Sequence, residues 1–324
     1  MQTRLGSRFA FDLVHIKDFL NRHIIGQSAA IDALCQQLNL IKAGLHAPDR
    51  PLMVMLSVGD TGVGKTELVR LLAQALHGDK RAFCRIDMNT LSQSHYSAAI
   101  TGAPPGYVGS KENTTLIDEE KIKGSASRPG IVLFDEIEKA SPDVARSLMN
   151  IFDRGALPLA SGTRVLDFSN CLVFMTSNLG SRQSQNQSRK WWPFQAKSPS
   201  HREQVEAALN QHFDPEFLNR IDHIALFEPL TNAQIEAIIA LEIESTNLLL
   251  AKRNIRISLD QDALSWIQAR GFDPRYGARS IKRNFSSLVL HPLAEALLDA
   301  EPAQNGIMLS FRGSLLDQKI RFSL

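Results

Sequence analysis

The chain has 324 residues, of which 44% are hydrophobic, 22% charged and 7% aromatic, proportions that are typical of a soluble globular protein. Its formal net charge of +2 and its three cysteines, which form no CxxC pair, argue against a nucleic-acid partner, a disulfide framework and a zinc site. No apolar run has the length of a transmembrane helix or of a signal-peptide core, so we expect a cytoplasmic protein without membrane contact.

The residue pattern up to Pro229 predicts a helical lead-in followed by alternating strands and helices. Residues 12–48 carry apolar side chains at helical spacing, and Pro48 and Pro51 end that segment. Apolar runs then predict strands that are buried on both faces, at 52–58, 82–88, 131–134 and 171–176, and a shorter strand at 223–227. Because helical stretches lie between these runs, we predict a doubly wound α/β sheet of parallel strands.

After Pro229 the pattern changes to a smaller, mostly helical region. Helices are expected at 232–250, 262–269 and 280–298, and short strands at 255–259, 307–311 and 319–322. We therefore divide the chain into a helical lead-in at 1–50, a large α/β subdomain at 51–229 and a small C-terminal subdomain at 230–324.

The segment 181–200 is rich in Ser, Gln, Arg, Lys and Pro, and this composition predicts a long surface loop. It contains Trp191, Trp192 and Phe194. These rings either pack back onto the body of the protein or form a docking site for an adaptor protein, because large aromatics on a polar loop are unusual without a partner.

Residues 59–66, Gly-Asp-Thr-Gly-Val-Gly-Lys-Thr, match the phosphate-loop pattern GxxxxGK[ST] between a predicted strand and a predicted helix at 67–76. Glycines let successive N–H groups turn inward around a phosphate. Lys65 is expected to reach the β- and γ-phosphates of ATP, and the Thr66 hydroxyl is expected to bind Mg²⁺. The predicted nucleotide-binding residues here are Gly59, Thr61, Gly62, Val63, Gly64, Lys65, Thr66 and Glu67.

A second motif is acidic, because the apolar run 131–134 ends in Asp135 and Glu136. Charges at the end of a buried strand are costly unless they face a cation or a solvated cleft, and doubly wound folds bind ligands at the carboxyl ends of their strands. Asp135 therefore suits the Mg²⁺ shell, and Glu136 suits the general base that activates the attacking water. The alternative is that both residues cap the following helix.

Three more polar residues have candidate roles in catalysis. Asn178 follows the run 171–176 and is predicted to position the attacking water opposite Glu136, although an Asn after a strand is by itself more often a turn residue. Arg220 precedes the last strand of the large subdomain, and Arg279 opens a helix of the small one. Each Arg either forms a solvated salt bridge or neutralises the γ-phosphate in the transition state.

Together these motifs resemble the second ATPase module of the Hsp100/Clp unfoldases of the ClpB and ClpA type. The shared strings cover nearly the whole chain: 24–27 (IIGQ), 59–68, 85–88 (RIDM), 102–109 (GAPPGYVG), 133–140, 142–144, 167–168, 175–180, 215–222 and 276–279 (YGAR). The resemblance implies an AAA+ P-loop NTPase with a three-layer α/β/α parallel sheet and a mainly helical small lid domain. It also implies ATPase activity, with ATP and Mg²⁺ as cofactors.

The resemblance also implies roles for single residues. Ile24 and Ile25 would line the adenine pocket, Asn178 would be sensor 1, and Arg279 would be sensor 2. Arg220 would be the arginine finger that completes the site of a neighbouring subunit, which implies a homo-oligomer in the form of a hexameric ring.

Tyr107, followed by Val108, would be the pore-loop aromatic that grips a threaded polypeptide, because an aromatic ring between glycines offers a sequence-tolerant contact. The alternative is that this ring packs against its own subunit.

The sequence departs from the family at several positions. Asp60 stands where Pro is usual, so an extra negative charge lies near the phosphates. Residues 110–115 replace the usual Gly-Gly pair, and the tripeptide with which relatives engage a ClpP-type peptidase is absent near 191–194. Delivery to that peptidase is therefore not expected. The missing N-terminal, first ATPase and middle domains indicate a single-ring paralogue or a fragment.

We consider three functions. The first is an ATP-driven machine that threads or remodels polypeptides through a central pore. The second is an ATP-controlled assembly factor or scaffold that acts on a dedicated partner without threading. A nucleic-acid motor is the third, and the near-neutral charge disfavours it.

Overall fold

The structure, a computed structural model, describes residues 7–92, 98–101, 115–160, 164–180, 200–300 and 308–324. The chain folds into two compact units. The first contains the residues up to Glu228 other than Thr61–Val63, and the second contains Thr61–Val63 and the residues from Pro229 onwards. The predicted pore residues Tyr107 and Val108, and residues 181–199 of the predicted loop, lie outside the described residues.

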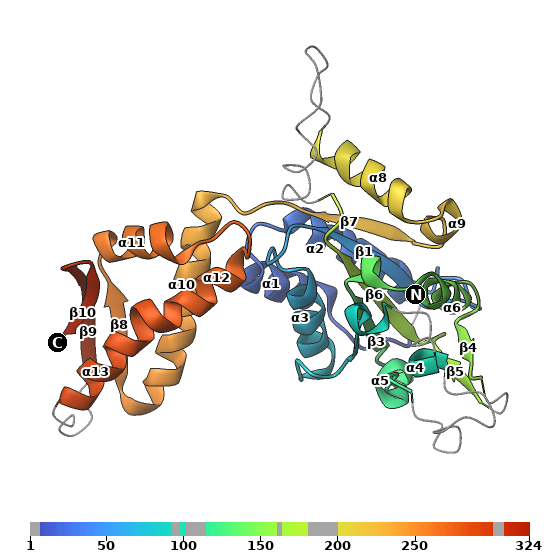
Figure 1. Ribbon diagram of the computed structural model, residues 1–324. Coiled ribbons are helices and arrows are strands. Elements are labelled where there is room, and N and C mark those ends of the chain that lie inside the picture. The colour runs from blue at the N-terminus through green and yellow to red at the C-terminus, as the bar shows by residue number, and fades with distance from the viewer. Residues whose placement is uncertain (1–6, 93–97, 102–114, 161–163, 181–199, 301–307) are drawn as a thin grey trace, which may run out of the picture. The chain divides into compact units, whose positions relative to one another are not determined.

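A parallel sheet forms the centre of the first unit (Figure 1). Across the sheet its five strands are β2 (Cys84–Asp87), β3 (Gly130–Asp135), β6 (Cys171–Ser177), β1 (Met53–Gly59) and β7 (His223–Phe227). Each predicted apolar run overlaps one of them. β1, β3 and β6 are buried along their whole length, as expected for strands covered on both faces. The predicted parallel sheet is confirmed.

The order of the strands brings the chemically interesting segments to one edge. β6 lies between β1 and β3, and all neighbouring strands in the sheet are parallel. The carboxyl ends of the strands therefore share one edge of the sheet. The phosphate loop follows β1 at this edge, Glu136 follows β3, and Asn178 follows β6.

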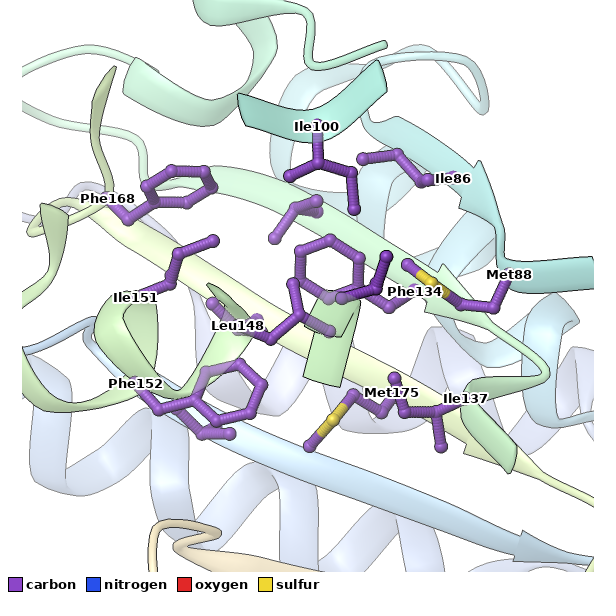
Figure 2. Close-up of a cluster of buried hydrophobic side chains, with 14 of the residues drawn as sticks. Ile86, Met88, Ile100, Phe134, Ile137, Leu148, Ile151, Phe152, Phe168 and Met175 are labelled. Carbon is purple, nitrogen blue, oxygen red and sulfur yellow. The ribbon is translucent and has the colours of Figure 1, made fainter. Parts of the chain in front are cut away.

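One face of the sheet is covered by helices that follow β2 and β3 and by two that precede β7. They are α4 (Ala98–Thr101), α5 (Glu119–Lys123), α6 (Pro142–Arg154), α8 (His201–His212) and α9 (Pro215–Leu218). Figure 2 shows Leu148, Ile151 and Phe152 of α6 gathered near Phe134 of β3 and Met175 of β6, within a fully buried cluster. The amphipathic pattern of α6 accounts for this packing, since its buried residues recur at helical spacing.

The opposite face is covered by helices from the first part of the unit, α1 (Leu13–His23), α2 (Ser28–Lys42) and α3 (Lys65–His77). α3 contacts β1, β3 and β6, α2 contacts β7, and α1 packs on both helices. The sequence predicted a helical segment at 12–48, and the structure divides it at Ile24–Gln27. Gly26 has a φ of 81°, which an α-helix does not accept.

A small hairpin of β4 (Ala156–Pro158) and β5 (Val165–Asp167) lies outside the main sheet. The sequence did not predict it, because three-residue strands carry too little alternation to be recognised.

The second unit consists of a helical layer and a three-stranded sheet. Its helices are α10 (Asn232–Leu250), α11 (Gln261–Gly271), α12 (Ala278–Phe285) and α13 (His291–Asp299), and its strands are β8 (Ile255–Leu259), β9 (Leu309–Leu316) and β10 (Lys319–Ser323). Thr231 and Gln234 form a capping box that begins α10 at the predicted residue. The predicted helix at 280–298 is interrupted by a π-helical turn at Ser286–Leu290.

All three cysteines are free and buried. Burial raises the pKa of the Cys171 thiol well above its ordinary value and also raises that of Cys84, which favours the protonated thiol in both. They pack as small apolar residues of the core. None of the described helices is long and apolar enough to cross a membrane.

The Gln27 side chain links the segment between α1 and α2 to Glu228, the last residue of the first unit. Its side chain is almost fully buried. The amide nitrogen Nε2 donates to the carbonyl oxygen of Glu228 at 2.9 Å, and Oε1 accepts from the Glu228 N–H at 3.0 Å. Both backbone groups of the last residue of the unit are therefore satisfied by one side chain.

We predict that Gln27→Ala lowers the free energy of unfolding of the first unit by about 1–3 kcal/mol, because it leaves two backbone groups of Glu228 without partners. Urea unfolding followed by circular dichroism measures this. Gln36→Ala, at an exposed position of α2, is the matched control and should change stability by less than about 0.5 kcal/mol. Equal effects of the two variants would contradict the prediction.

Candidate nucleotide-binding site

The phosphate loop has the strand–loop–helix setting that its pattern requires. β1 ends at Gly59, and α3 begins at Lys65. Gly64 precedes α3 with a φ of 110° and offers no side chain to cap the helix, so the first N–H groups of α3 are left for an anion. The loop thus has the backbone of a phosphate cradle.

Lys65 is nearly buried and points back over the loop. Its Nζ donates to the carbonyl oxygens of Gly59 at 2.6 Å and Asp60 at 2.7 Å, and to Asn178 Oδ1 at 3.0 Å. Two predicted catalytic residues, from the helix after β1 and from the end of β6, are therefore in direct contact. These two carbonyl oxygens are neutral acceptors. A bound phosphate would offer Lys65 negatively charged oxygens in their place.

The two predicted Mg²⁺ ligands are also in contact. Asp135 is 5% exposed, and its Oδ1 accepts from Thr66 Oγ1 at 3.2 Å and from Thr176 Oγ1 at 2.5 Å. Its Oδ2 accepts from Arg85 Nε at 3.0 Å and Nη2 at 2.6 Å. The carboxylate therefore has hydrogen bonds to both oxygens.

The donor set fits Mg²⁺ bound together with phosphates. A hydroxyl and a carboxylate supply oxygen ligands, which Mg²⁺ prefers, and two protein ligands suffice where substrate phosphates and waters complete the shell. In the part of the chain that the structure describes, no group of three or more His, Cys, Asp or Glu residues could hold a metal ion. The oxygen donors of Thr66 and Asp135 suit a metal that arrives with a nucleotide.

Glu136 has an unusual backbone conformation. Its φ of 58° is in the left-handed region, where non-glycine residues are uncommon and which often marks functional sites. Its N–H donates to Thr176 Oγ1 at 3.0 Å, and its side chain is half-buried. The turn directs the chain away from the end of β3 and leaves the carboxylate accessible to water.

Asn178 is held by a residue that the sequence analysis did not single out. Glu138 Oε1 accepts from the Asn178 N–H at 3.1 Å and from its Nδ2 at 3.3 Å. The amide oxygen of Asn178 is thereby directed to Lys65. Glu138 and Thr176 were both missed, although a hydroxyl at the end of an apolar strand was a visible signal in the case of Thr176.

Comparison with known proteins gives a consistent assignment. Residues 50–224 match the family model described as the AAA domain (Cdc48 subfamily), and residues 230–308 match the C-terminal D2-small domain of ClpB protein. The chain belongs to the Hsp100/Clp family of AAA+ ATPases.

Individual relatives support this assignment. The Hsp100/Clp chain is 43% identical to the ATP-dependent protease ATP-binding subunit-like protein AmiB of Pseudomonas aeruginosa, over 99% of this chain and 89% of that one. It is 41% identical to the chaperone protein ClpB of Agrobacterium fabrum, over 89% of this chain and 32% of that one. The chain thus spans about a third of ClpB.

A solved structure agrees. A cryo-EM reconstruction of Hsp104 in a closed state, with ATPγS and FITC casein, matches 96% of this chain and 51% of its own, with a TM-score of 0.77 and 29% identity. The resemblance, the AAA+ fold and the assignment as an ATPase are confirmed.

Ile24, predicted to line the adenine pocket of this Hsp100/Clp protein, lies beside the phosphate loop. It is buried, and a Cβ built on Gly64 would lie 3.5 Å from Ile24 Cγ2. Ile25 is half-buried. The location suits an apolar wall next to the phosphates, and the contact with adenine stays a prediction.

Arg220, the predicted arginine finger, is paired with acidic residues of the same chain. Its Nε donates to Asp153 Oδ2 at 2.6 Å, and its Nη2 to Glu216 Oε1 at 3.0 Å. The hydrogen bond to Asp153 raises the pKa of Arg220 above its ordinary value. Neither Asp153 nor Glu216 is a predicted nucleotide ligand.

The tip of the phosphate loop, Thr61–Val63, belongs to the second unit. The Ala278 N–H donates to the Gly62 carbonyl oxygen at 3.0 Å, and a Cβ on Gly62 would lie 2.1 Å from the Tyr276 carbonyl oxygen. Only glycine fits this approach. Arg279 is exposed at the second residue of α12, and its role as sensor 2 stays a prediction.

We predict that Glu138→Ala lowers kcat for ATP roughly tenfold or more and changes KM much less, because Asn178 loses its two hydrogen bonds to Glu138. Glu138→Gln should retain most of the activity, since its amide carbonyl still accepts. Steady-state ATPase assays separate kcat from KM. The control, Glu206→Ala on the exposed face of α8, should behave like the wild type, and an unchanged kcat in Glu138→Ala would refute the assignment.

Proposed function

We propose that this ATPase is a ring-forming motor that unfolds or remodels polypeptides by drawing them through a central pore. The observation that carries the proposal is the convergence of Lys65, Thr66, Asp135, Glu136 and Asn178 at one edge of the sheet. In an AAA+ protein this convergence supports coupling of ATP hydrolysis to mechanical work.

Each residue has a part in the proposed hydrolysis. The phosphates bind to the N–H groups at the start of α3 and to the Lys65 ammonium. Lys65 then gives up its hydrogen bonds to the carbonyl oxygens of Gly59 and Asp60. Glu136 accepts a proton from the attacking water, and Asn178 positions that water. Thr66 and Asp135 would hold Mg²⁺, which would neutralise part of the phosphate charge.

Arg220 supports a role for a second subunit. An arginine at the γ-phosphate accelerates hydrolysis roughly 10³–10⁵-fold in known cases, and Arg220 is paired with Asp153 and Glu216 in its own subunit. In the proposed ring, a hexamer, the guanidinium exchanges these partners for the phosphates bound by its neighbour.

The polypeptide client is proposed from two sources. The related Hsp104 reconstruction is of that protein with ATPγS and FITC casein, and casein is a polypeptide. The sequence of this chain places Tyr107 and Val108 in the string GAPPGYVG. An aromatic ring flanked by glycines suits a moving, sequence-tolerant grip.

We predict that Tyr107→Ala retains most of the ATPase activity and abolishes unfolding of a fluorescent protein client. Tyr107→Phe keeps the ring and should keep the unfolding activity. Glu136→Gln, as a reference for failed chemistry, should lower kcat by roughly 10²–10⁴-fold. Persistence of unfolding in Tyr107→Ala would exclude threading and favour the assembly-factor alternative. Loss of one stoichiometric partner when Trp191 and Trp192 are both changed to Ala would support that alternative directly.

We predict that Arg220→Ala and Lys65→Ala are each inactive as ATPases, and that an equal mixture recovers activity. With random mixing, roughly a quarter of the interfaces pair an intact finger with an intact phosphate loop. ATPase assays of the mixture, with each variant alone as the control, measure the recovery. If mixing restores nothing, Arg220 does not act across the interface.

A further inference from the structure

Arg85 makes a two-pronged ion pair with the predicted metal ligand Asp135. Both Nε and Nη2 of the guanidinium donate to the same oxygen, Oδ2, at 3.0 and 2.6 Å. The other oxygen, Oδ1, accepts from Thr66 and Thr176. Arg85 therefore supplies the only full positive charge bonded to this carboxylate among the described residues.

The carboxylate needs a cation at this position. Its side chain is 8% exposed, whereas that of Arg85 is 50% exposed. An ionised carboxylate so far removed from water is costly unless a charge or strong hydrogen bonds compensate it. The neutral hydroxyls of Thr66 and Thr176 donate hydrogen bonds to Oδ1 but do not neutralise the negative charge of the carboxylate. The Arg85 guanidinium neutralises that charge.

The fold accounts for the location of Arg85. β2 is an edge strand with alternating burial, in which Cys84 and Ile86 join the core while Arg85 and Asp87 are exposed. Asp87 pairs in register with Asp135 on β3, but the carboxylate of Asp87 accepts from the Asn89 N–H at 3.0 Å. Arg85 thus extends along the sheet edge to Asp135.

We propose that Arg85 is a built-in counter-cation of the metal site, which competes with Mg²⁺ for Asp135 and so sets the Mg²⁺ concentration that nucleotide binding requires. The proposal rests on the nucleotide site proposed above. Two cations share one carboxylate, so each lowers the affinity of the carboxylate for the other. Arg85 is a positioning residue that acts through Asp135 and does not take part in the chemistry.

The test is a Mg²⁺ titration of nucleotide binding, without turnover. A fluorescent ADP analogue is bound to the full-length wild type, Arg85→Gln and Arg85→Lys, and Mg²⁺ is added from an EDTA-buffered start. Arg85→Gln should reach half-saturation at a Mg²⁺ concentration roughly three- to tenfold lower than the wild type. Arg85→Lys keeps the positive charge but loses the two-nitrogen geometry, so its half-saturating Mg²⁺ concentration should lie between those of the wild type and Arg85→Gln.

Thermal unfolding gives a second readout. In EDTA, Arg85→Gln should melt below the wild type, because the carboxylate has lost its cation, and Mg²⁺ with ADP should raise its melting temperature by more than that of the wild type. Arg146→Gln is the matched control, since Arg146 pairs with Asp143 on the exposed face of α6. It should match the wild type in both measurements.

The outcomes separate this proposal from the proposed function. A wild type that binds no nucleotide at any Mg²⁺ concentration overturns the nucleotide site itself. A half-saturating Mg²⁺ concentration in Arg85→Gln that is unchanged within a factor of about two, or higher, overturns the competition alone. A loss of ADP affinity that persists at saturating Mg²⁺ would assign the guanidinium to the phosphates instead and also overturn it.

Discussion

The carboxylate of Asp135 is the interaction on which the candidate site depends. It is buried at the end of a strand whose other residues are apolar, so each of its hydrogen bonds is a requirement of burial. Through Thr66 it joins the first turn of α3, through Thr176 it joins β6, and through Arg85 it joins β2. Three strands and the phosphate-loop helix are thereby fixed around a single charge.

Thr176 extends this arrangement to the predicted catalytic base. Its hydroxyl donates to Asp135 and accepts from the Glu136 N–H, which helps to keep Glu136 in its left-handed conformation. Left-handed backbone at a non-glycine residue costs on the order of 1–3 kcal/mol and persists only where the surroundings impose it. The same buried charge that suits a metal therefore also sets the direction in which the base leaves the sheet.

Much of the fold and part of the site were predictable from the sequence, for physical reasons. Strands buried on both faces appear in the sequence as uninterrupted apolar runs. The phosphate loop and the pair Asp135 and Glu136 directly follow two of these runs, so the order of elements was enough to place both motifs at the ends of strands. The family assignment followed from the same strings. The β4–β5 hairpin and the break between α1 and α2 were not predicted, because short strands and single positive-φ glycines leave a weak pattern.

The partners of the site residues were the unpredictable part. Glu138 holds Asn178 from 40 positions away, and Arg85 holds Asp135 from 50 positions away, and neither distance follows from a motif. An exposed Arg on an edge strand and a Glu after an acidic pair both look like ordinary surface residues in a sequence. Only the register of β2, β3 and β6 brings them to their partners.

These internal partners change how binding should be understood. Lys65 is bonded to two carbonyls and an amide, Asp135 to two hydroxyls and a guanidinium, and Arg220 to two carboxylates. In the proposed function, a nucleotide with its metal, or a neighbouring subunit, would exchange these contacts for others, so the affinity would be a difference between two satisfied states. Because each exchange begins from a neutralised charge, no step requires a bare ion to be buried. In the function proposed above, ligand binding and release therefore both exchange one set of partners for another.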